Sequence, residues 1–207
     1  MSRNHNFLLA GVGGQGTLLA SNVLSEVGLE AGYDVKKSEV HGMAQRGGSV
    51  NTHVRWNIEQ VYSPLIGLGE ADILLAFEEA EALRYGEYLK EGGIVIVNQY
   101  TIKPITVTSG GAHYPAEKEL YRVLGAATEQ LHIIPGTAIA KELGNVRTAN
   151  VVLLGALSTF LDVPEKTWLH VIEERVPPRF VALNHQAFSR GRQAVAGQGF
   201  DRESTGT

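Results

Sequence analysis

Residues 7–16 read Phe-Leu-Leu-Ala-Gly-Val-Gly-Gly-Gln-Gly, and they give the clearest indication of the fold class. Phe7–Ala10 is a short apolar run, which is typical of a buried strand, and Gly11 ends it. From Thr17 onward, apolar residues recur at helical spacing until Gly32, which is a natural helix stop. A strand, a glycine turn and a helix in this order predict the first strand–helix unit of an α/β fold.

The rest of the chain continues the alternation of strands and helices. The strand at residues 49–56 alternates in polarity, with Val54 on one face and His53 on the other, which predicts one buried face and an antiparallel or edge position. We expect a three-layer, Rossmann-like α/β sandwich with a mostly parallel, mixed sheet, in a single domain over residues 1–196 with a flexible tail at 197–207. The expected strands are 35–40, 49–56, 72–77, 93–97 and 131–134 with a minor strand at 106–108, and the expected helices are 78–90, 115–125, 137–143, 150–161, 165–176 and 180–195.

Composition excludes several classes of protein. Hydrophobic residues make up 43% of the 207 residues, which is enough for a core and excludes wholesale disorder. The net charge of −4 lacks the basic excess of a duplex-DNA binder, so we expect no nucleic-acid partner. The chain has no cysteine, which excludes disulfides, cysteine nucleophiles and cysteine-ligated iron–sulfur clusters within it.

No segment has the pattern of a membrane anchor or an export signal. The longest uncharged apolar stretch, Thr148–Leu161, is shorter than the ~20 residues that span a bilayer. The N-terminal residues lack a secretory cleavage pattern. We therefore expect a soluble, unprocessed protein of the cytoplasm with no membrane partner.

The first motif that could carry chemistry is G-x-G-x-x-G at residues 11–16. It follows a strand and opens a helix, the context in which glycines admit a phosphate and free N–H groups favour an anion. Glu39, near the end of the second strand, could complete a dinucleotide site. In the alternative interpretation the glycines only make a tight turn. The candidate binding residues here are Gly11, Gly13, Gly14, Gln15 and Gly16.

The second motif is the polar, glycine-rich segment His41–Ser49. An Arg fork with flanking N–H, amide and hydroxyl donors can hold a carboxylate or phosphate. We favour a ligand contact or a protein interface over a merely solvated loop. The candidate residues are Arg46, Gly47, Gly48 and Ser49.

The sequence offers no catalytic constellation. None of the seven histidines lies two, three or four positions from another, so we expect no metal site. Glu78, Glu79 and Glu81 follow a strand and open a helix, and we interpret them as acids at the positive helix end rather than as catalytic groups. We therefore expect binding residues but no catalytic residue.

Both motifs together resemble one family. AGVGGQGTLLASNVL at residues 10–24 and SEVHGMAQRGGSVNTHVRW at 38–56 are similar to the gamma-type subunits of 2-oxoacid:ferredoxin oxidoreductases. The amino-acid sequence of residues 41–49 is most similar to that of the small (beta) subunits of the indolepyruvate branch. The resemblance continues through residues 74–79, 136–138, 145–150 and the last helix, and so covers roughly residues 6–193.

The resemblance implies a fold, an activity and a partner. The fold would be that of the gamma domain of pyruvate:ferredoxin oxidoreductase. The complex would decarboxylate an aryl 2-oxoacid such as indolepyruvate, join the acyl group to coenzyme A and reduce ferredoxin. A large partner subunit would hold thiamine diphosphate and the 4Fe-4S clusters, so this small subunit would bind no cofactor of its own and be inactive alone. The glycine motif and residues 46–49 are our own candidates for coenzyme A contact.

Three alternatives stay open at this stage. The substrate could be another 2-oxoacid such as phenylglyoxylate. The chain could be a free-standing nucleotide-binding module that uses Gly11, Gly13, Gly16 and Glu39. It could also be a purely structural assembly subunit with an empty glycine motif.

Overall fold

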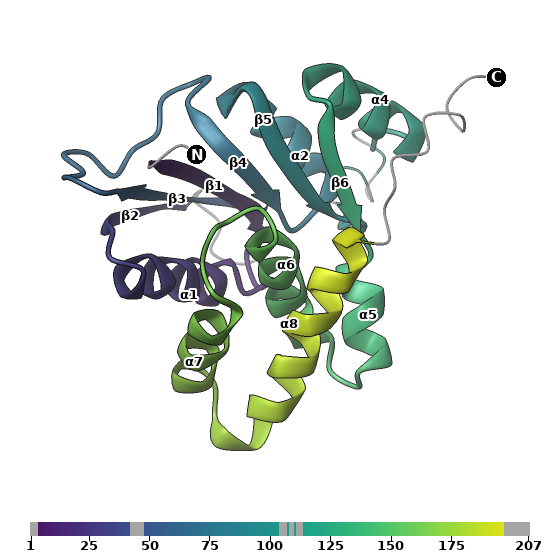
Figure 1. The fold of residues 1–207 in the computed structure, drawn as a ribbon. Coiled ribbons are helices and arrows are strands. Elements are labelled where there is room, and N and C mark those ends of the chain that lie inside the picture. The colour runs from purple at the N-terminus through teal and green to yellow at the C-terminus, as the bar shows by residue number, and fades with distance from the viewer. Residues whose placement is uncertain (1–3, 42–47, 104–106, 108–109, 111–113, 197–207) are drawn as a thin grey trace.

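A computed structural model describes residues 4–41, 48–103, 107, 110 and 114–196 (Figure 1). Six strands of the described chain form one sheet in the order β2-β3-β1-β4-β5-β6. Only β3 runs antiparallel to its neighbours β1 and β2, and β1, β4, β5 and β6 are parallel. The strands are β1 (His5–Val12), β2 (Asp34–His41), β3 (Ser49–Asn57), β4 (Ala71–Ala76), β5 (Leu89–Asn98) and β6 (Gln130–Ile134).

Helices cover both faces of the sheet, which confirms the expected three-layer α/β architecture. The first core cluster joins one face to α1 (Thr17–Glu30), α5 (Gly136–Glu142), α6 (Ala149–Ser158), α7 (Glu165–Arg175) and α8 (Val181–Ala196). The second joins the other face to α2 (Glu79–Arg84) and α4 (Glu117–Ala127). Short 3-10 turns lie at Gly86–Tyr88, Val146–Thr148 and Pro178–Phe180. No helix in the described ranges is long and apolar enough to cross a bilayer.

Helix α6 is the buried centre of the lower layer in Figure 1. It carries no charged residue, and Asn150 through Ser158 are all buried. α8 crosses it so closely that a Cβ on Gly155 would lie 2.1 Å from the Phe188 carbonyl oxygen. A Cβ on Gly191 would lie 1.9 Å from the Val152 carbonyl oxygen. The two glycines therefore set the depth of α6, and with it the position of the helix start that faces the glycine turn.

Strand β3 differs from the expectation of one buried face. It lies between β2 and β1, and Asn51, Thr52 and His53 are all buried. The chain after β3 folds back over the expected polar face, and the Ile66 N–H donates to His53 Nδ1 over 3.1 Å. The antiparallel pairing of β3 is confirmed, but the strand is internal and not at an edge.

Other differences concern element length. The helix expected at 78–90 ends at Arg84, because Gly86 follows soon after and Leu89 pairs with Ala71 to begin β5. The expected strand at 106–108 and the tail at 197–207 lie outside the described residues, apart from residue 107.

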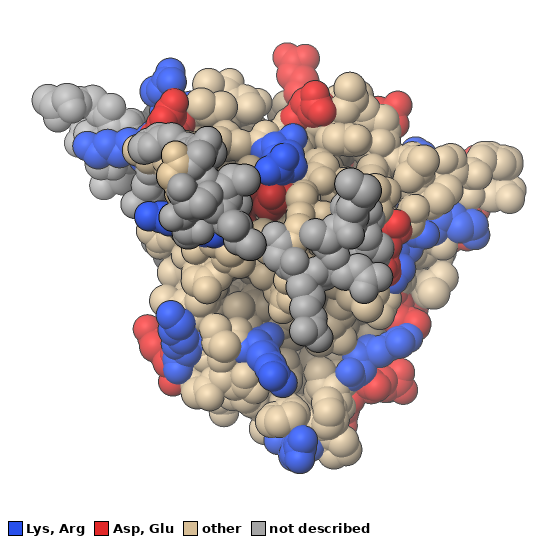
Figure 2. Space-filling view, turned by 180° about the vertical axis from the view of Figure 1, so that it is seen from behind, with Lys and Arg blue, Asp and Glu red and all other residues tan. Residues whose placement is uncertain are grey.

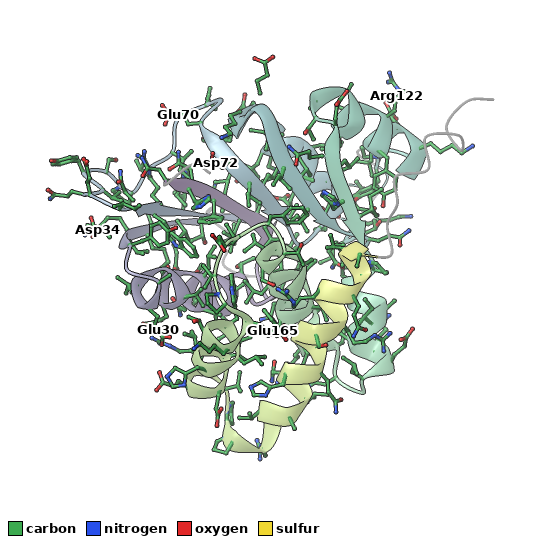
Figure 3. The ribbon with its side chains drawn as sticks, viewed as in Figure 1. Glu30, Asp34, Glu70, Asp72, Arg122 and Glu165 are labelled. Atoms are coloured by element: carbon green, nitrogen blue, oxygen red, sulfur yellow. The ribbon has the colours of Figure 1, made fainter. Side chains whose placement is uncertain are left out.

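Acidic and basic side chains are interspersed around the face in Figure 2. Asp34 is the first residue of β2, Asp72 is the second residue of β4, and Glu70 precedes β4. They therefore lie at the opposite end of the sheet from the glycine turn, which follows the end of β1 (Figure 3). Their negative charge is kept away from the candidate anion site.

Candidate functional site

The glycine turn lies at the carboxyl ends of the neighbouring strands β1 and β4, where the chain leaves the two strands toward opposite faces of the sheet. The chain leaves β1 toward α1 on one face and leaves β4 toward α2 on the other. Such a switch of direction opens a crevice at the carboxyl ends of parallel strands. Gln15 stabilises this point: its Oε1 accepts from the Val12 N–H over 2.7 Å, and its Nε2 donates to the Phe77 carbonyl over 2.8 Å. The Gln15 amide is thus occupied by the backbone.

The glycines of the turn differ in what they permit. Gly11 lies where a Cβ would come within 2.8 Å of Thr17 Cγ2, and Gly16 lies where it would come within 2.5 Å of Asn150 Nδ2. Gly14 has φ +107° and nothing within 4 Å of its Cβ position. Gly11 and Gly16 therefore serve close packing, whereas the space beside Gly14 is open.

The start of α1 offers unpaired donors. Gly16, in the left-handed conformation at φ 79°, caps the helix without a side-chain hydrogen bond. The N–H groups of Gly14, Gly16, Thr17 and Leu18 have no acceptor among the described residues. Free N–H groups at the positive end of a helix are a ready anion-binding site.

A cavity of about 530 Å³ opens beside these donors. We call it the glycine pocket: its walls are residues 13–16 with Leu19, the ends of β4 and β5 with Tyr100 and Ile102, Thr137, and residues 146–150 apart from Thr148. Its volume lies within the ~300–1,000 Å³ of small-molecule sites. The sequence motif identified one wall, whereas residues 98–102, Thr137 and 146–150 were not expected to form a site.

The structure brings the two sequence motifs together. The Gly13 N–H donates to the Gly48 carbonyl oxygen over 2.9 Å. Ser49 points elsewhere: its hydroxyl donates to the Glu81 carboxylate and lies 3.0 Å from Tyr85 Oη. Arg46 and Gly47 lie outside the described residues.

The acidic residues after β4 are buried, which the sequence did not indicate. Glu78 accepts hydrogen bonds from the Glu81 N–H, the Ile102 N–H and Tyr114 Oη. Its first contact confirms the helix-start interpretation, because Glu78 is the N-cap of α2. Burial first, and then the hydrogen bond to Glu78, raise the pKa of the Tyr114 hydroxyl.

Glu79 completes this polar layer. Its carboxylate accepts from Thr101 Oγ1 over 2.7 Å and from Tyr121 Oη over 2.9 Å. With Glu78 it fixes the segment after β5, including Tyr100 and Ile102 of the glycine pocket. These carboxylates are therefore positioning groups for one wall.

Glu39 does not meet the glycine turn, which corrects the dinucleotide interpretation. β3 is inserted between β1 and β2, so Glu39 on β2 lies two strand spacings, roughly 10 Å, from β1. Its carboxylate accepts from Lys37 Nζ over 2.7 Å, and it is not a wall of the glycine pocket. The ribose contact expected of it is absent from the described site.

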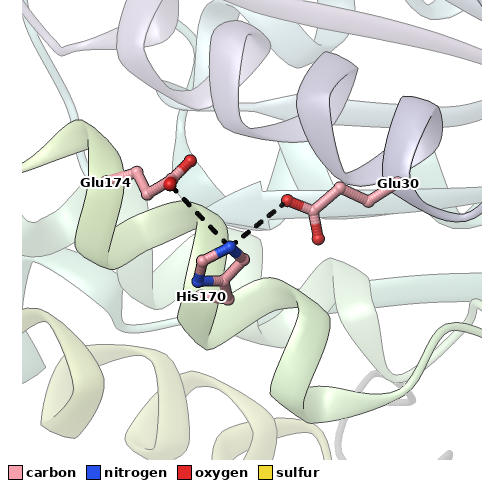
Figure 4. Close-up of side chains that lie close together, drawn as sticks. All are labelled: Glu30, His170 and Glu174. Atoms are coloured by element: carbon pink, nitrogen blue, oxygen red, sulfur yellow. Dashed lines mark ion pairs between the residues drawn. The ribbon is translucent and has the colours of Figure 1, made fainter.

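A histidine with two carboxylates lies far from the pocket, between α1 and α7 (Figure 4). His170 Nε2 lies 3.8 Å from a carboxylate oxygen of Glu30 and 3.8 Å from one of Glu174. The spacing of the histidines did not predict this group, because the partners of His170 are glutamates. All three side chains are exposed, as in ordinary surface ion pairs.

Comparison with known proteins assigns the family. Residues 6–194 match the family of pyruvate ferredoxin/flavodoxin oxidoreductase. The chain belongs to this family. It is 42% identical over 196 residues to the indolepyruvate oxidoreductase subunit IorB of Thermococcus kodakarensis, covering 93% of this chain and 96% of that subunit. It is 28% identical over 190 residues to the 2-oxoglutarate synthase subunit KorC of Methanothermobacter thermautotrophicus, covering 90% of this chain and 93% of KorC.

Solved structures of oxoacid oxidoreductases share the fold. The gamma subunit of a keto/oxoacid ferredoxin oxidoreductase from Geobacter sulfurreducens superposes with a TM-score of 0.70 at 25% identity, covering 94% of this chain and 99% of that one. The 2-oxoglutarate:ferredoxin oxidoreductase of Magnetococcus marinus, solved with 2-oxoglutarate, coenzyme A and succinyl-CoA, gives a TM-score of 0.76 at 22% identity. The alignment covers 96% of this chain but 32% of the Magnetococcus chain, so this chain spans about a third of it.

Proposed function

We propose that this chain is the small, cluster-free subunit of a complex that oxidatively decarboxylates aryl 2-oxoacids such as indolepyruvate. The 2-oxoacid and coenzyme A give the acyl-CoA and carbon dioxide, and two electrons pass to ferredoxin. The observation that carries the substrate class is the 42% identity to an indolepyruvate subunit, against 28% to a 2-oxoglutarate subunit over nearly the same length.

The chemistry is divided between two subunits in this proposal. Thiamine diphosphate supplies the carbanion chemistry in the large partner subunit, which also carries the 4Fe-4S clusters. Without a cysteine, this chain cannot ligate such a cluster through thiolates. Its own contribution is to bind and orient a co-substrate beside the partner, in a complex that works in the cytoplasm and is inactive without the large subunit.

The proposed co-substrate contact is coenzyme A at the glycine turn and residues 46–49. The open N–H groups of Gly14 and Gly16 support it, as does the hydrogen bond that holds Gly48 against Gly13. Gln15 contributes by holding the glycine turn and Ser49 by holding the start of β3, since their side chains bond to the protein itself. Arg46 enters the proposal on its chemistry alone, as a bidentate phosphate donor.

The test is the substrate preference of the complex co-expressed with a thiamine-dependent large subunit. Indolepyruvate, phenylglyoxylate, pyruvate and 2-oxoglutarate are compared by kcat/KM. We expect an aryl substrate to exceed 2-oxoglutarate by more than about tenfold, or ~1.4 kcal/mol of transition-state binding. Equal use of 2-oxoglutarate would contradict the proposed substrate class, and a preference for phenylglyoxylate would replace indolepyruvate within it.

A further inference from the structure

We propose that the outer edge of β2 pairs with the same edge of a second copy of this chain. The two strands run antiparallel, and the two sheets join into one across a two-fold axis that passes through Ser38. Such a contact uses the same surface of both copies, as in most homodimers. The inference concerns assembly, and it depends neither on the substrate class nor on the glycine pocket.

β2 lies at the outer edge of the sheet in Figure 1 and has β3 as its single neighbour among the described strands. All eight of its residues pair with β3 one to one, from Asp34↔Asn57 to His41↔Val50. Its sequence, DVKKSEVH, contains no proline or glycine that would bend or interrupt the strand. A regular edge of this kind presents a row of backbone N–H and C=O groups and is a template for a further strand.

The charges of β2 are balanced within the strand. Lys36 Nζ lies 3.1 Å from Asp34 Oδ1, and Lys37 Nζ lies 2.7 Å from Glu39 Oε1. Lysines on an edge strand usually prevent association with other chains. Because each lysine here has a carboxylate beside it, the strand carries no net charge that would repel a second copy.

Symmetry and charge together select one register for the pair. Hydrogen-bonded and non-hydrogen-bonded residues alternate along an antiparallel pair, so a two-fold axis must pass through a residue and its own copy. An axis at Lys36 or Lys37 would place two lysines opposite each other, and an axis at Glu39 would place two glutamates opposite each other. An axis at Ser38 instead places Lys37 opposite Glu39 of the second copy, twice. Facing residues of opposite charge stabilise a strand pair, whereas like charges destabilise it.

The other pairs of this register are also compatible. Residues 35–41 of each copy are paired, and Ser38 faces Ser38, two hydroxyls that can hydrogen-bond across the strands. Lys36 faces Val40 of the second copy, and Val40 is one of the large apolar residues exposed in the single chain. The aliphatic stem of a lysine can cover such a side chain while its charge stays in water.

Helix α1 is placed so that it would meet its own copy on one face of the joined sheet. It lies over β2 and β3, because a Cβ on Gly28 would lie 2.5 Å from Trp56 Nε1 and 2.8 Å from Val35 Cγ2. A helix above the last two strands is roughly 5 Å from the two-fold axis, since strands lie about 4.8 Å apart. The two copies of α1 would therefore lie roughly 10 Å apart, which is a normal distance for packed helices.

The side of α1 that would meet its copy is partly apolar. α7 packs beside the helix, and the side of α1 turned toward β2 carries Leu18, Asn22, Ser25 and Leu29 at helical spacing. Asn22 on this side accepts a hydrogen bond from Lys37 of β2. Leu18 and Leu29, at the two ends of the row, are about half exposed. Because helices related by this axis run antiparallel, Leu18 would lie near Leu29 of the second copy.

The experiment reverses the charges of the facing pair in two separate variants. Lys37→Glu gives glutamates at positions 37 and 39, and Glu39→Lys gives lysines at both. Each variant faces its own copy with like charges, so we expect the dissociation constant of its dimer to rise about tenfold or more. In an equimolar mixture, one chain of each kind can form a dimer whose facing pairs are again opposite in charge. We therefore expect mixing to restore the dimer.

Sedimentation equilibrium of the full chain over a micromolar concentration range measures the assembly. The wild-type chain should reach twice its mass of 22.4 kDa. Both variants lose the bond between Lys37 and Glu39 within one chain, so rescue by mixing reports a contact between chains. Arg190→Glu is the matched control, because it reverses a charge that pairs with Glu142 between α8 and α5. It should leave the dimer unchanged.

A wild-type chain that stays monomeric over this range, both alone and in the complex with the large subunit, would overturn the inference. So would a dimer that neither charge reversal weakens, or one that mixing does not restore. Charge reversals that weaken only the co-elution with the large subunit would assign the edge of β2 to that subunit instead. None of these outcomes depends on which 2-oxoacid the complex oxidises, so the inference and the proposed function can fail separately.

Discussion

The N–H of Gly13 donates to the carbonyl oxygen of Gly48 over 2.9 Å, although the two residues lie in different motifs. This bond places Gly48, the residue before β3, against the turn that follows β1. A ligand held by the glycine turn would therefore lie next to Gly48. The two motifs form one site only because β3 pairs with β1 from Val12↔Ser49 onward and brings Gly48 to this position.

The glycine turn should tolerate side chains unequally. Gly16→Ala places a Cβ 2.5 Å from Asn150 Nδ2 at a positive φ, so we expect a loss of about 1–3 kcal/mol in the free energy of unfolding. Gly86→Ala is the control, because nothing lies within 4 Å of its Cβ position. Urea titration of both variants measures the effect, and equal midpoints would show that the turn is not strained.

The crossing of α6 and α8 should be the most sensitive point of the core. Gly191→Ala puts a Cβ 1.9 Å from the Val152 carbonyl oxygen, so the helices must separate. Overpacking of this kind costs about 1–3 kcal/mol. Gly125→Ala in α4 meets nothing within 4 Å and should stabilise the protein by about 0.5–1 kcal/mol. Thermal melts of the two variants should shift in opposite directions.

Stability should fall in mild acid, in part through His53. Burial lowers the pKa of the His53 imidazole, whose Nδ1 accepts from the Ile66 N–H. The unfolded chain therefore binds the proton more readily, and stability present above about pH 6.5 is lost as the pH falls through the folded pKa.

His53→Asn should make the free energy of unfolding less dependent on pH over this range. Burial also lowers the pKa values of His5 and His132, so the variant keeps a reduced slope rather than none. An unchanged slope, measured by urea unfolding across the range, would exclude His53 as a contributor.

Arg46 should matter for co-substrate binding rather than for folding. Arg46 is followed by Gly47 and Gly48 in a polar segment, so its side chain is not expected to support the core. In the co-expressed complex, Arg46→Ala should raise the KM for coenzyme A about tenfold to a hundredfold, and Arg46→Lys should raise it less. A change of less than about twofold, with an unchanged circular dichroism spectrum, would return the segment to a solvated loop.

Local patterns predicted most of the fold. The strand at residues 7–10, the glycine turn and the helix from Thr17 lie where expected, because a strand–turn–helix unit is specified by adjacent residues. The fold class followed from the alternation of strands and helices. The position of β3 inside the sheet could not be predicted from its alternating polarity. That pattern does not show that a later segment of the chain covers the polar face of the strand. His53 is polar yet buried, since Ile66 covers it.

The candidate site was predicted in part, for a similar reason. The glycines predict a turn. The hydrogen bonds of the Gln15 side-chain amide to the backbone of Val12 and Phe77 could not be predicted, because they depend on where β4 ends. The position of Glu39 was predicted wrongly because β2, the strand that follows β1 in the sequence, was expected to lie next to β1 in the sheet. β3 lies between them. No sequence pattern predicted that Arg147 lines the pocket. Its 3-10 turn reaches the pocket because α6, which follows it, packs against the sheet.

Ferredoxin reduction by the assembled complex shows whether this chain is a required part of an oxidoreductase. The chain and a thiamine-dependent large subunit are co-expressed, purified by a tag on one of them, and supplied with indolepyruvate, coenzyme A and oxidised ferredoxin. We expect both chains to elute together and to reduce ferredoxin only when coenzyme A is present, while neither chain alone does so. Separate elution at micromolar concentration, or full activity of the large subunit alone, would contradict it.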